Sequence, residues 1–108
     1  MPAVSLFVYG SLMSEERFLA VTGRRCPRRP ARLEDFARIQ SARGYPYVVP
    51  RAGCHVDGLL VEGIDPHALR KLDAYEDEGR LYLRRRVWVT VGGERVAAET
   101  YVGNLAPS

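Results

Sequence analysis

The chain has 108 residues, of which 46% are hydrophobic, and it carries a net charge of +3 at neutral pH. This length is typical of one domain with a modest hydrophobic core, and we expect that domain to span residues 1–108. No apolar run approaches the roughly 20 residues of a membrane-spanning helix. The first residues also lack a basic segment followed by an apolar one, so we expect a cytoplasmic protein that does not bind membranes.

The two cysteines, Cys26 and Cys54, form no C-x-x-C pair. A cytoplasmic chain rarely carries a structural disulfide, so we expect two buried thiols. His55 lies next to Cys54, but adjacent side chains of a strand point to opposite faces. His67 is the only other histidine, and a zinc site would need carboxylates to complete it. We therefore predict no metal and no cofactor.

The first predicted element is a strand, because Leu6-Phe7-Val8 is an apolar run of strand formers. Gly10-Ser11 follows and predicts a tight loop whose backbone N–H groups could bind a carboxylate or an oxyanion. An ordinary turn after a buried strand is the alternative interpretation. A short helix is expected from Ser14, a favoured N-cap, to about Thr22, and Gly23 is a natural residue to end it.

The middle of the chain is expected to be mostly extended. The segment from Arg24 to Pro30 is predicted to be a surface loop, because its two prolines disfavour helix and strand pairing. A strand is predicted from Leu33 to Ile39. Gly44 to Pro50 contains two further prolines and is expected to be an edge strand or a loop. Another strand is predicted from His55 to Glu62.

A second helix is predicted from Pro66, with Asp65 as its N-cap, to about Glu76. Each helical residue advances about 100°, which places Glu76 roughly 20° from the apolar Leu69 and Asp73 roughly 40° from it. A carboxylate on an apolar stripe is costly to bury unless it is paired or has a task. The alternative is that the helix has frayed at its end and leaves Glu76 in water.

The C-terminal part predicts a hairpin. Tyr82–Val91 and Val96–Val102 have the alternation of strands, and Gly92-Gly93 between them is a strong turn signal. Asn104–Ser108 is expected to be a loose tail. Because strands outnumber helices, we predict an α+β fold in which the sheet curls into a small barrel and so removes exposed edges.

Two short stretches and their spacing point to a known family. They are Val-Tyr-Gly-Ser-Leu at 8–12 and Leu-Asp-Ala-Tyr-Glu at 72–76, the second followed by Tyr82 and Arg84. With similar stretches at 44–46, 56–58 and 98–102, nearly the whole chain resembles the gamma-glutamylcyclotransferase-like family, also called AIG2-like. Asp77 departs from the pattern, because the family usually has glycine there, which bears on loop geometry and substrate choice.

The resemblance implies a small mixed β-barrel flanked by short helices, with a cavity beside the early loop. It implies an enzyme that cyclises a gamma-glutamyl amide, a small-molecule substrate, to 5-oxoproline and releases an amine. Glu76 matches the family's general acid/base. The substrate-binding residues expected from the matching loop and from the cavity are Tyr9, Gly10, Ser11, Leu12 and Tyr82, with Tyr45 as a further cavity residue.

The reaction makes chemical sense of these residue types. The substrate's own α-amine attacks its γ-carbonyl, so a proton acceptor is needed and an enzyme nucleophile is not. Partial burial would raise the pKa of Glu76 toward neutrality and make it an effective base. Asp73 is the fallback carboxylate, with a structural role on the helix as its first interpretation. The leaving amine and the oligomeric state stay open.

Two other functions compete with this enzymatic one. A protein of the same fold could bind a small carboxylate without turnover, since fold and function are separable. Two arginine clusters invite a nucleic-acid interpretation, although no recognised binding motif accompanies them and we expect no nucleic-acid partner. The clusters comprise Arg24, Arg25, Arg28, Arg29 and Arg32, and Arg84, Arg85 and Arg86.

Overall fold

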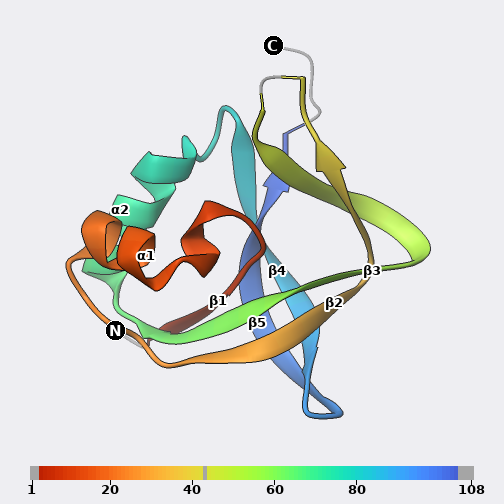
Figure 1. The fold of residues 1–108 in the computed structure, drawn as a ribbon, viewed down its shortest axis with the longest axis horizontal. Coiled ribbons are helices and arrows are strands. Elements are labelled where there is room, and N and C mark those ends of the chain that lie inside the picture. The colour runs from red at the N-terminus through yellow and green to blue at the C-terminus, as the bar shows by residue number, and fades with distance from the viewer. Residues whose placement is uncertain (1–2, 43, 105–108) are drawn as a thin grey trace.

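The structure, a computed structural model, describes residues 3–42 and 44–104 and consists of a closed β-barrel with two helices packed against it (Figure 1). The strands are β1 (Val4–Val8), β2 (Arg28–Gln40), β3 (Pro46–Ile64), β4 (Tyr82–Val91) and β5 (Glu94–Gly103). The helices are α1 (Glu15–Thr22) and α2 (Pro66–Glu76), and a single 3-10 turn, η1 (Ser11–Met13), follows β1.

The barrel closes in the order β1-β3-β2-β4-β5. Neighbouring strands are antiparallel except at the closure, where β1 runs parallel to β5 with Leu6 opposite Glu99. The sheet is therefore mixed, and the predicted α+β fold with a small mixed barrel and short flanking helices is confirmed.

The long strands β2 and β3 account for both segments that contain two prolines. Pro46 to Pro50 pairs only with β2, so this part of β3 is the expected edge strand. The prediction of a loop from Arg24 to Pro30 is wrong beyond Pro27, because β2 begins at Arg28 and Pro30 lies opposite Leu59. On its other side β2 pairs with β4 only at Arg32 and Leu33. Pro30 therefore has no strand partner on that side, and its lack of an N–H costs no hydrogen bond there.

The alternating side chains of β1 divide the core in two. Phe7 packs with residues of the other strands, such as Leu33, inside the barrel. Leu6 faces the other way and packs with Phe18 of α1 and Leu72 of α2. All five of these side chains are almost completely buried, so β1 is buried on both faces, as an apolar run of three residues favours.

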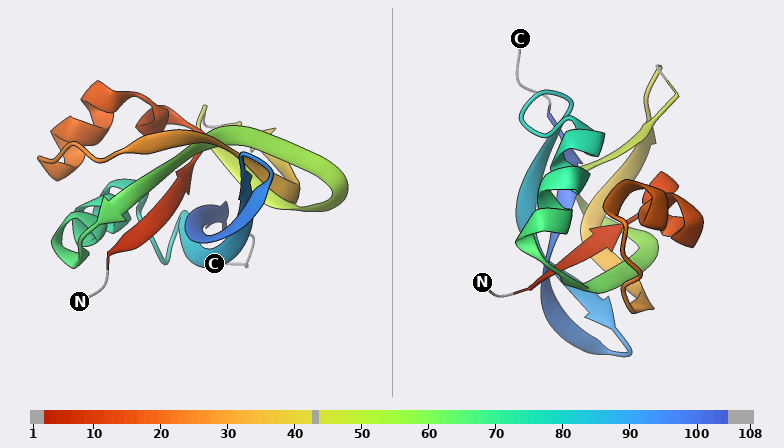
Figure 2. Two further views of the ribbon diagram at one scale, coloured as in Figure 1. Left: turned by 90° about the horizontal axis from the view of Figure 1, so that it is seen from below. Right: turned by 90° about the vertical axis from the view of Figure 1, so that its left-hand side faces the viewer.

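The helix ends match their predicted caps. The Ser14 side chain accepts a hydrogen bond from the Arg17 N–H at 3.2 Å, and the Asp65 carboxylate accepts one from the Ala68 N–H at 2.8 Å. The two helices pack side by side against the barrel, as both views in Figure 2 show. Helix α2 remains regular to Glu76 and is not frayed.

Asp77 ends α2 in the left-handed conformation, with φ of +56°, that glycine commonly supplies at this position. Aspartate tolerates this conformation better than most residues. Its carboxylate also binds the Arg80 side chain, with Nε to Oδ2 at 2.7 Å. The departure from the family pattern therefore leaves the helix end intact.

Both cysteines are free, but only Cys26 is buried and Cys54 is half-buried. Asn104, the first residue of the expected tail, donates to the Arg80 carbonyl at 3.0 Å, and residues 105–108 lie outside the described part. Within residues 3–42 and 44–104, no helix is long and apolar enough to cross a membrane.

Candidate active site

A cavity of about 350 Å³ opens between the loop after β1, the start of β3 and the end of α2. Its deeper lining is buried, whereas three of its residues, Ser11, Gly44 and Tyr75, are exposed and form its mouth. The structure brings all the predicted site residues to this cavity: Tyr9, Gly10, Ser11, Leu12, Glu76 and Tyr82, together with Tyr45.

Glu76 is the last residue of α2, and its half-buried side chain lines the cavity. Burial raises the pKa of this carboxyl from 4.5 to about 7, because the charged form is poorly solvated. Among the described residues, no hydrogen bond or ion pair reaches the carboxylate. Glu76 can therefore exist in both protonation states near neutral pH.

Asp73, one turn earlier on α2, has the opposite environment and does not line the cavity. Arg84 donates to both of its carboxylate oxygens, at 2.8 and 3.1 Å, and the Tyr101 hydroxyl donates to Oδ1 at 2.7 Å. These bonds satisfy the charged form of Asp73. The fallback carboxylate is therefore engaged in a structural network, and Glu76 is the carboxylate available to a ligand.

The loop from Gly10 to Met13 contains the single 3-10 turn η1, whose bonds run from each N–H back to a carbonyl three residues earlier. The Met13 N–H donates to the Gly10 carbonyl at 3.0 Å, and the Ser14 N–H donates to the Ser11 carbonyl at 3.1 Å. Within the described residues, no acceptor binds the N–H groups of Gly10, Ser11 or Leu12. Three backbone donors beside the cavity are thus left for a carboxylate or an oxyanion.

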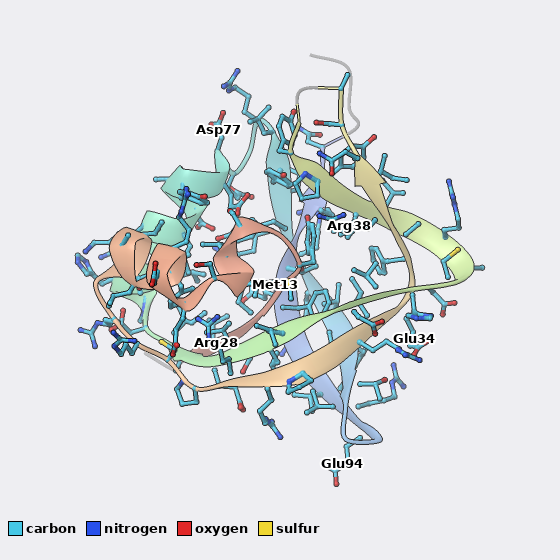
Figure 3. All side chains as sticks on the ribbon, viewed as in Figure 1. Met13, Arg28, Glu34, Arg38, Asp77 and Glu94 are labelled. Atoms are coloured by element: carbon cyan, nitrogen blue, oxygen red, sulfur yellow. The ribbon has the colours of Figure 1, made fainter. Side chains whose placement is uncertain are left out.

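Two contacts fix the position of this loop. A Cβ on Gly10 would lie 3.1 Å from Pro46 Cγ, so glycine allows the loop to approach the start of β3 closely. At the other end of the loop, Arg28 Nη1 donates a hydrogen bond to the Met13 carbonyl at 2.8 Å (Figure 3). The Arg28 guanidinium also lies over the Phe18 ring, 5.5 Å from its centroid. Sequence analysis missed Arg28, because it placed this residue in a surface loop.

Buried tyrosines form much of the cavity lining. The hydroxyl of Tyr9 donates to the Tyr101 carbonyl and that of Tyr82 donates to the Pro46 carbonyl. Burial raises the pKa values of Tyr9, Tyr82 and Tyr101 above their usual range, so all three are neutral at physiological pH. Their rings offer apolar contact surface, and their hydroxyl protons are already donated within the protein.

Tyr75 and Tyr101 are functional candidates that sequence analysis did not identify. The Tyr75 hydroxyl lies 2.8 Å from Ser11 Oγ and accepts a bond from Arg17 Nη1 at 3.3 Å. Tyr75 immediately precedes Glu76 in the second family stretch, and Tyr101 lies in the closing stretch at 98–102, so both were within segments already singled out. Position in the motif was the available signal.

Much of the first arginine cluster is paired with carboxylates. Arg29 binds both oxygens of Glu62, at 2.9 and 3.2 Å. Further pairs are Arg24 with Asp65 at 3.2 Å and Arg32 with Asp57 at 3.1 Å. In the second cluster Arg84 pairs with Asp73 and Glu99. These arginines are thus less available for phosphate contacts than the sequence alone implied.

Comparison with known proteins identifies the class to which this barrel and its cavity belong. The chain matches the family described as gamma-glutamyl cyclotransferase, AIG2-like, over residues 6–107. It therefore belongs to this family, and the resemblance drawn from the two stretches is confirmed.

Among curated proteins, the chain is similar to AIG2-like protein C of Arabidopsis thaliana, with 34% identity over 101 residues. The matched region covers 93% of this chain and 59% of that protein, so the chain spans about three fifths of its relative's length.

Solved structures have the same fold. A protein from Arabidopsis thaliana, known from its solution structure, matches with a TM-score of 0.88 and 28% identity, covering 100% of this chain and 73% of that one. A structure named gamma-glutamyl cyclotransferase matches with a TM-score of 0.82 and 21% identity, covering 95% of this chain and 68% of that one. At 21% identity the second likeness concerns the fold alone.

Proposed function

We propose that the protein is a gamma-glutamyl cyclotransferase that converts a gamma-glutamyl amide to 5-oxoproline and a free amine. The observation that carries the proposal is the Glu76 carboxyl, which has no partner within the described part of the chain and lies in the same cavity as the N–H groups of Gly10, Ser11 and Leu12, for which that part holds no acceptor either. Membership of the gamma-glutamyl cyclotransferase, AIG2-like family supports it. The substrate is a small molecule, and the protein acts on it in the cytoplasm.

The reaction requires a proton to move twice. The substrate's α-ammonium group first transfers a proton to Glu76, and the freed amine nitrogen attacks the γ-carbonyl carbon. A C–N bond forms, the carbonyl oxygen becomes an oxyanion, and the attacking nitrogen releases its second proton to solvent. The original amide C–N bond then breaks, the carbonyl re-forms, and the leaving nitrogen takes a proton from Glu76. One carboxyl can perform both transfers in turn.

The raised pKa of Glu76 suits this task. A substrate α-amine has a pKa of about 8, whereas an ordinary glutamate has a pKa of about 4.3 and is a weak base toward it. A carboxyl with a pKa of about 7 accepts the proton with little energetic cost and returns it readily. Asp73 cannot share this role while its oxygens accept bonds from Arg84 and Tyr101.

The loop supplies the second part of the site. The backbone donors of Gly10, Ser11 and Leu12 are suited to bind the substrate's carboxylate or to stabilise the oxyanion. Losing one oxyanion donor typically costs about 100- to 1,000-fold in rate. The cavity of about 350 Å³ accommodates a folded glutamyl group, and holding that group in its ring-closing shape lowers the barrier further.

The test is a panel of gamma-glutamyl amides with different leaving amines, assayed for 5-oxoproline. The panel includes gamma-glutamyl amino acids, glutathione and gamma-glutamyl polyamines. Release of 5-oxoproline from at least one of them supports the enzyme. A binding module instead predicts that ligands of this class raise the thermal stability of the protein while none of them yields 5-oxoproline, and that result would overturn the proposal.

A further inference from the structure

The end of α2 is joined to the barrel by an ionic cluster that no step of the proposed reaction uses. Arg84 of β4 donates Nε and Nη2 to the two oxygens of Asp73, at 2.8 and 3.1 Å. Its remaining Nη1 donates to Glu99 of β5. The Tyr101 hydroxyl completes the cluster by donating to Asp73 at 2.7 Å. A bidentate arginine–carboxylate pair is both stronger and more directional than a single ionic contact.

The cluster lies close to the acid/base. Asp73 and Glu76 are three residues apart, so their side chains emerge on the same side of α2. Tyr101 belongs to the cluster and also lines the cavity. The side chains of Asp73, Arg84 and Glu99 are each only about one quarter exposed, so solvent screens their charges less than those of surface pairs.

We propose that Arg84 is a positioning residue for Glu76 and sets the charge around it. It fixes the last turn of α2 against β4 and β5, and it neutralises Asp73, so that a second negative charge does not act on Glu76. This inference rests on the proposed function, because it assigns a purpose to the state of Glu76 that cyclisation requires.

Few other charges face Glu76 from the elements around it. Three tyrosines lie near it: Tyr9 from the loop after β1, Tyr82 from β4 and Tyr101 from β5. Burial keeps all three neutral. Two acidic residues follow Glu76 in the chain: Asp77 pairs with Arg80, and the Glu78 carboxylate accepts the Arg84 N–H at 3.2 Å. The Asp73–Arg84 pair is thus the charged group that a substitution can unbalance one turn from Glu76.

A purely structural role and a positioning role differ in the direction of a pH shift. Arg84→Gln leaves Asp73 without its cation, and the added negative field disfavours ionised Glu76, so the acidic limb of the kcat/KM profile moves to higher pH. Asp73→Asn removes a negative charge and leaves Arg84 bound to Glu99, so the same limb moves to lower pH. A loosened helix alone would lower kcat without moving the limb in opposite directions.

The experiment measures kcat/KM from about pH 5 to about pH 9 for the wild type and the two variants. It also follows the side-chain carboxyl of Glu76 by carbon-detected NMR titration. We expect the titration midpoint of Glu76 and the acidic limb of kcat/KM to move by about 0.5 pH unit or more, in opposite directions in the two variants, as Coulomb interactions over one helical turn give. Arg84→Lys, which keeps the charge, should lie near the wild type. Arg85→Gln removes an exposed arginine from the opposite face of the same strand and should cause no shift.

Shifts of Arg84→Gln and Asp73→Asn in the same direction, or no shift in either folded variant, would overturn the inference. If Arg84→Gln does not fold, the isosteric Asp73→Asn still tests the sign against the wild type. The NMR titration needs no turnover. If the wild type releases no 5-oxoproline but the Glu76 titration still shifts in the two variants as described, the proposed enzymatic function is refuted and the electrostatic role of Arg84 is retained.

Discussion

The Tyr75 hydroxyl lies 2.8 Å from Ser11 Oγ and so connects the helix that carries Glu76 to the loop that carries the free backbone donors. Arg17 of α1 donates to the same hydroxyl at 3.3 Å. The bond crosses the mouth of the cavity, where both side chains are exposed. It therefore sets the distance between the two halves of the site and contributes little to the core.

Tyr75→Phe removes this connection and keeps the ring. We expect KM for the gamma-glutamyl substrate to rise about 3- to 10-fold, because a hydrogen bond of this kind contributes about 1 kcal/mol. Thermal unfolding should change little, and Tyr47→Phe, which alters a tyrosine outside the cavity lining, should leave KM unchanged. A clear loss of stability with KM unchanged would assign the bond to folding instead.

Gly10→Ala tests the close approach of the loop to Pro46. The new Cβ would lie 3.1 Å from Pro46 Cγ, so either the Pro46 ring or the loop with its N–H groups must move by a few tenths of an ångström, and we expect the loop to move. We expect kcat/KM to fall at least about 10-fold in a folded protein, since misplaced donors lose much of their effect. Gly63→Ala is the control: its φ of +75° strains the variant away from the cavity, so stability should fall and activity persist. Equal activity of Gly10→Ala and wild type would remove the loop from the site.

The pH dependence of stability tests the burial of Glu76. Its pKa is raised from 4.5 to about 7 in the folded state, so the folded protein binds more protons than the unfolded chain between these values. The stability associated with this group is thus fully present below about pH 4.5 and is lost as pH rises through about 7. Glu76→Gln should remove this loss and be more stable than the wild type at about pH 8, by on the order of 2 kcal/mol or less for a half-buried group. Unfolding in urea at several pH values measures it, and a variant less stable than wild type at high pH would contradict the burial.

The paired arginines lead to a prediction about nucleic acids. With Arg24, Arg29 and Arg32 bound to carboxylates, we expect no shift of short single- or double-stranded oligonucleotides even at low salt. Electrophoretic mobility or fluorescence anisotropy measures this. Tight binding that weakens steeply with added salt would revive the nucleic-acid interpretation.

Local signals predicted most of the elements. Asp65 and Pro66 fixed the start of α2, and that start set the phase that places Glu76 toward the apolar side. Gly92-Gly93 predicted the hairpin between β4 and β5. Caps and turns depend on residues close together in the chain, and for this reason they can be recognised without knowledge of the fold.

Contacts between distant segments could not be predicted in the same way. Pro30 is tolerated in β2 only because β4 pairs elsewhere along that strand, which no local pattern reveals. The Ser11–Tyr75 bond joins residues 64 positions apart. Arg84 pairs with Asp73 only because the fold packs β4 against α2. This pairing determines that Asp73 is engaged and that Glu76 has no partner among the described residues.

The most direct test of the proposed chemistry is the rate of 5-oxoproline release by Glu76→Gln compared with the wild type at about pH 8. Glutamine keeps the size of the side chain but cannot exchange the proton, and general acid–base catalysis typically supplies about 100- to 10,000-fold in rate. We predict a folded variant whose kcat falls within or beyond that range. A folded Glu76→Gln protein that releases 5-oxoproline at a near-normal rate would show that this carboxyl is not the acid/base.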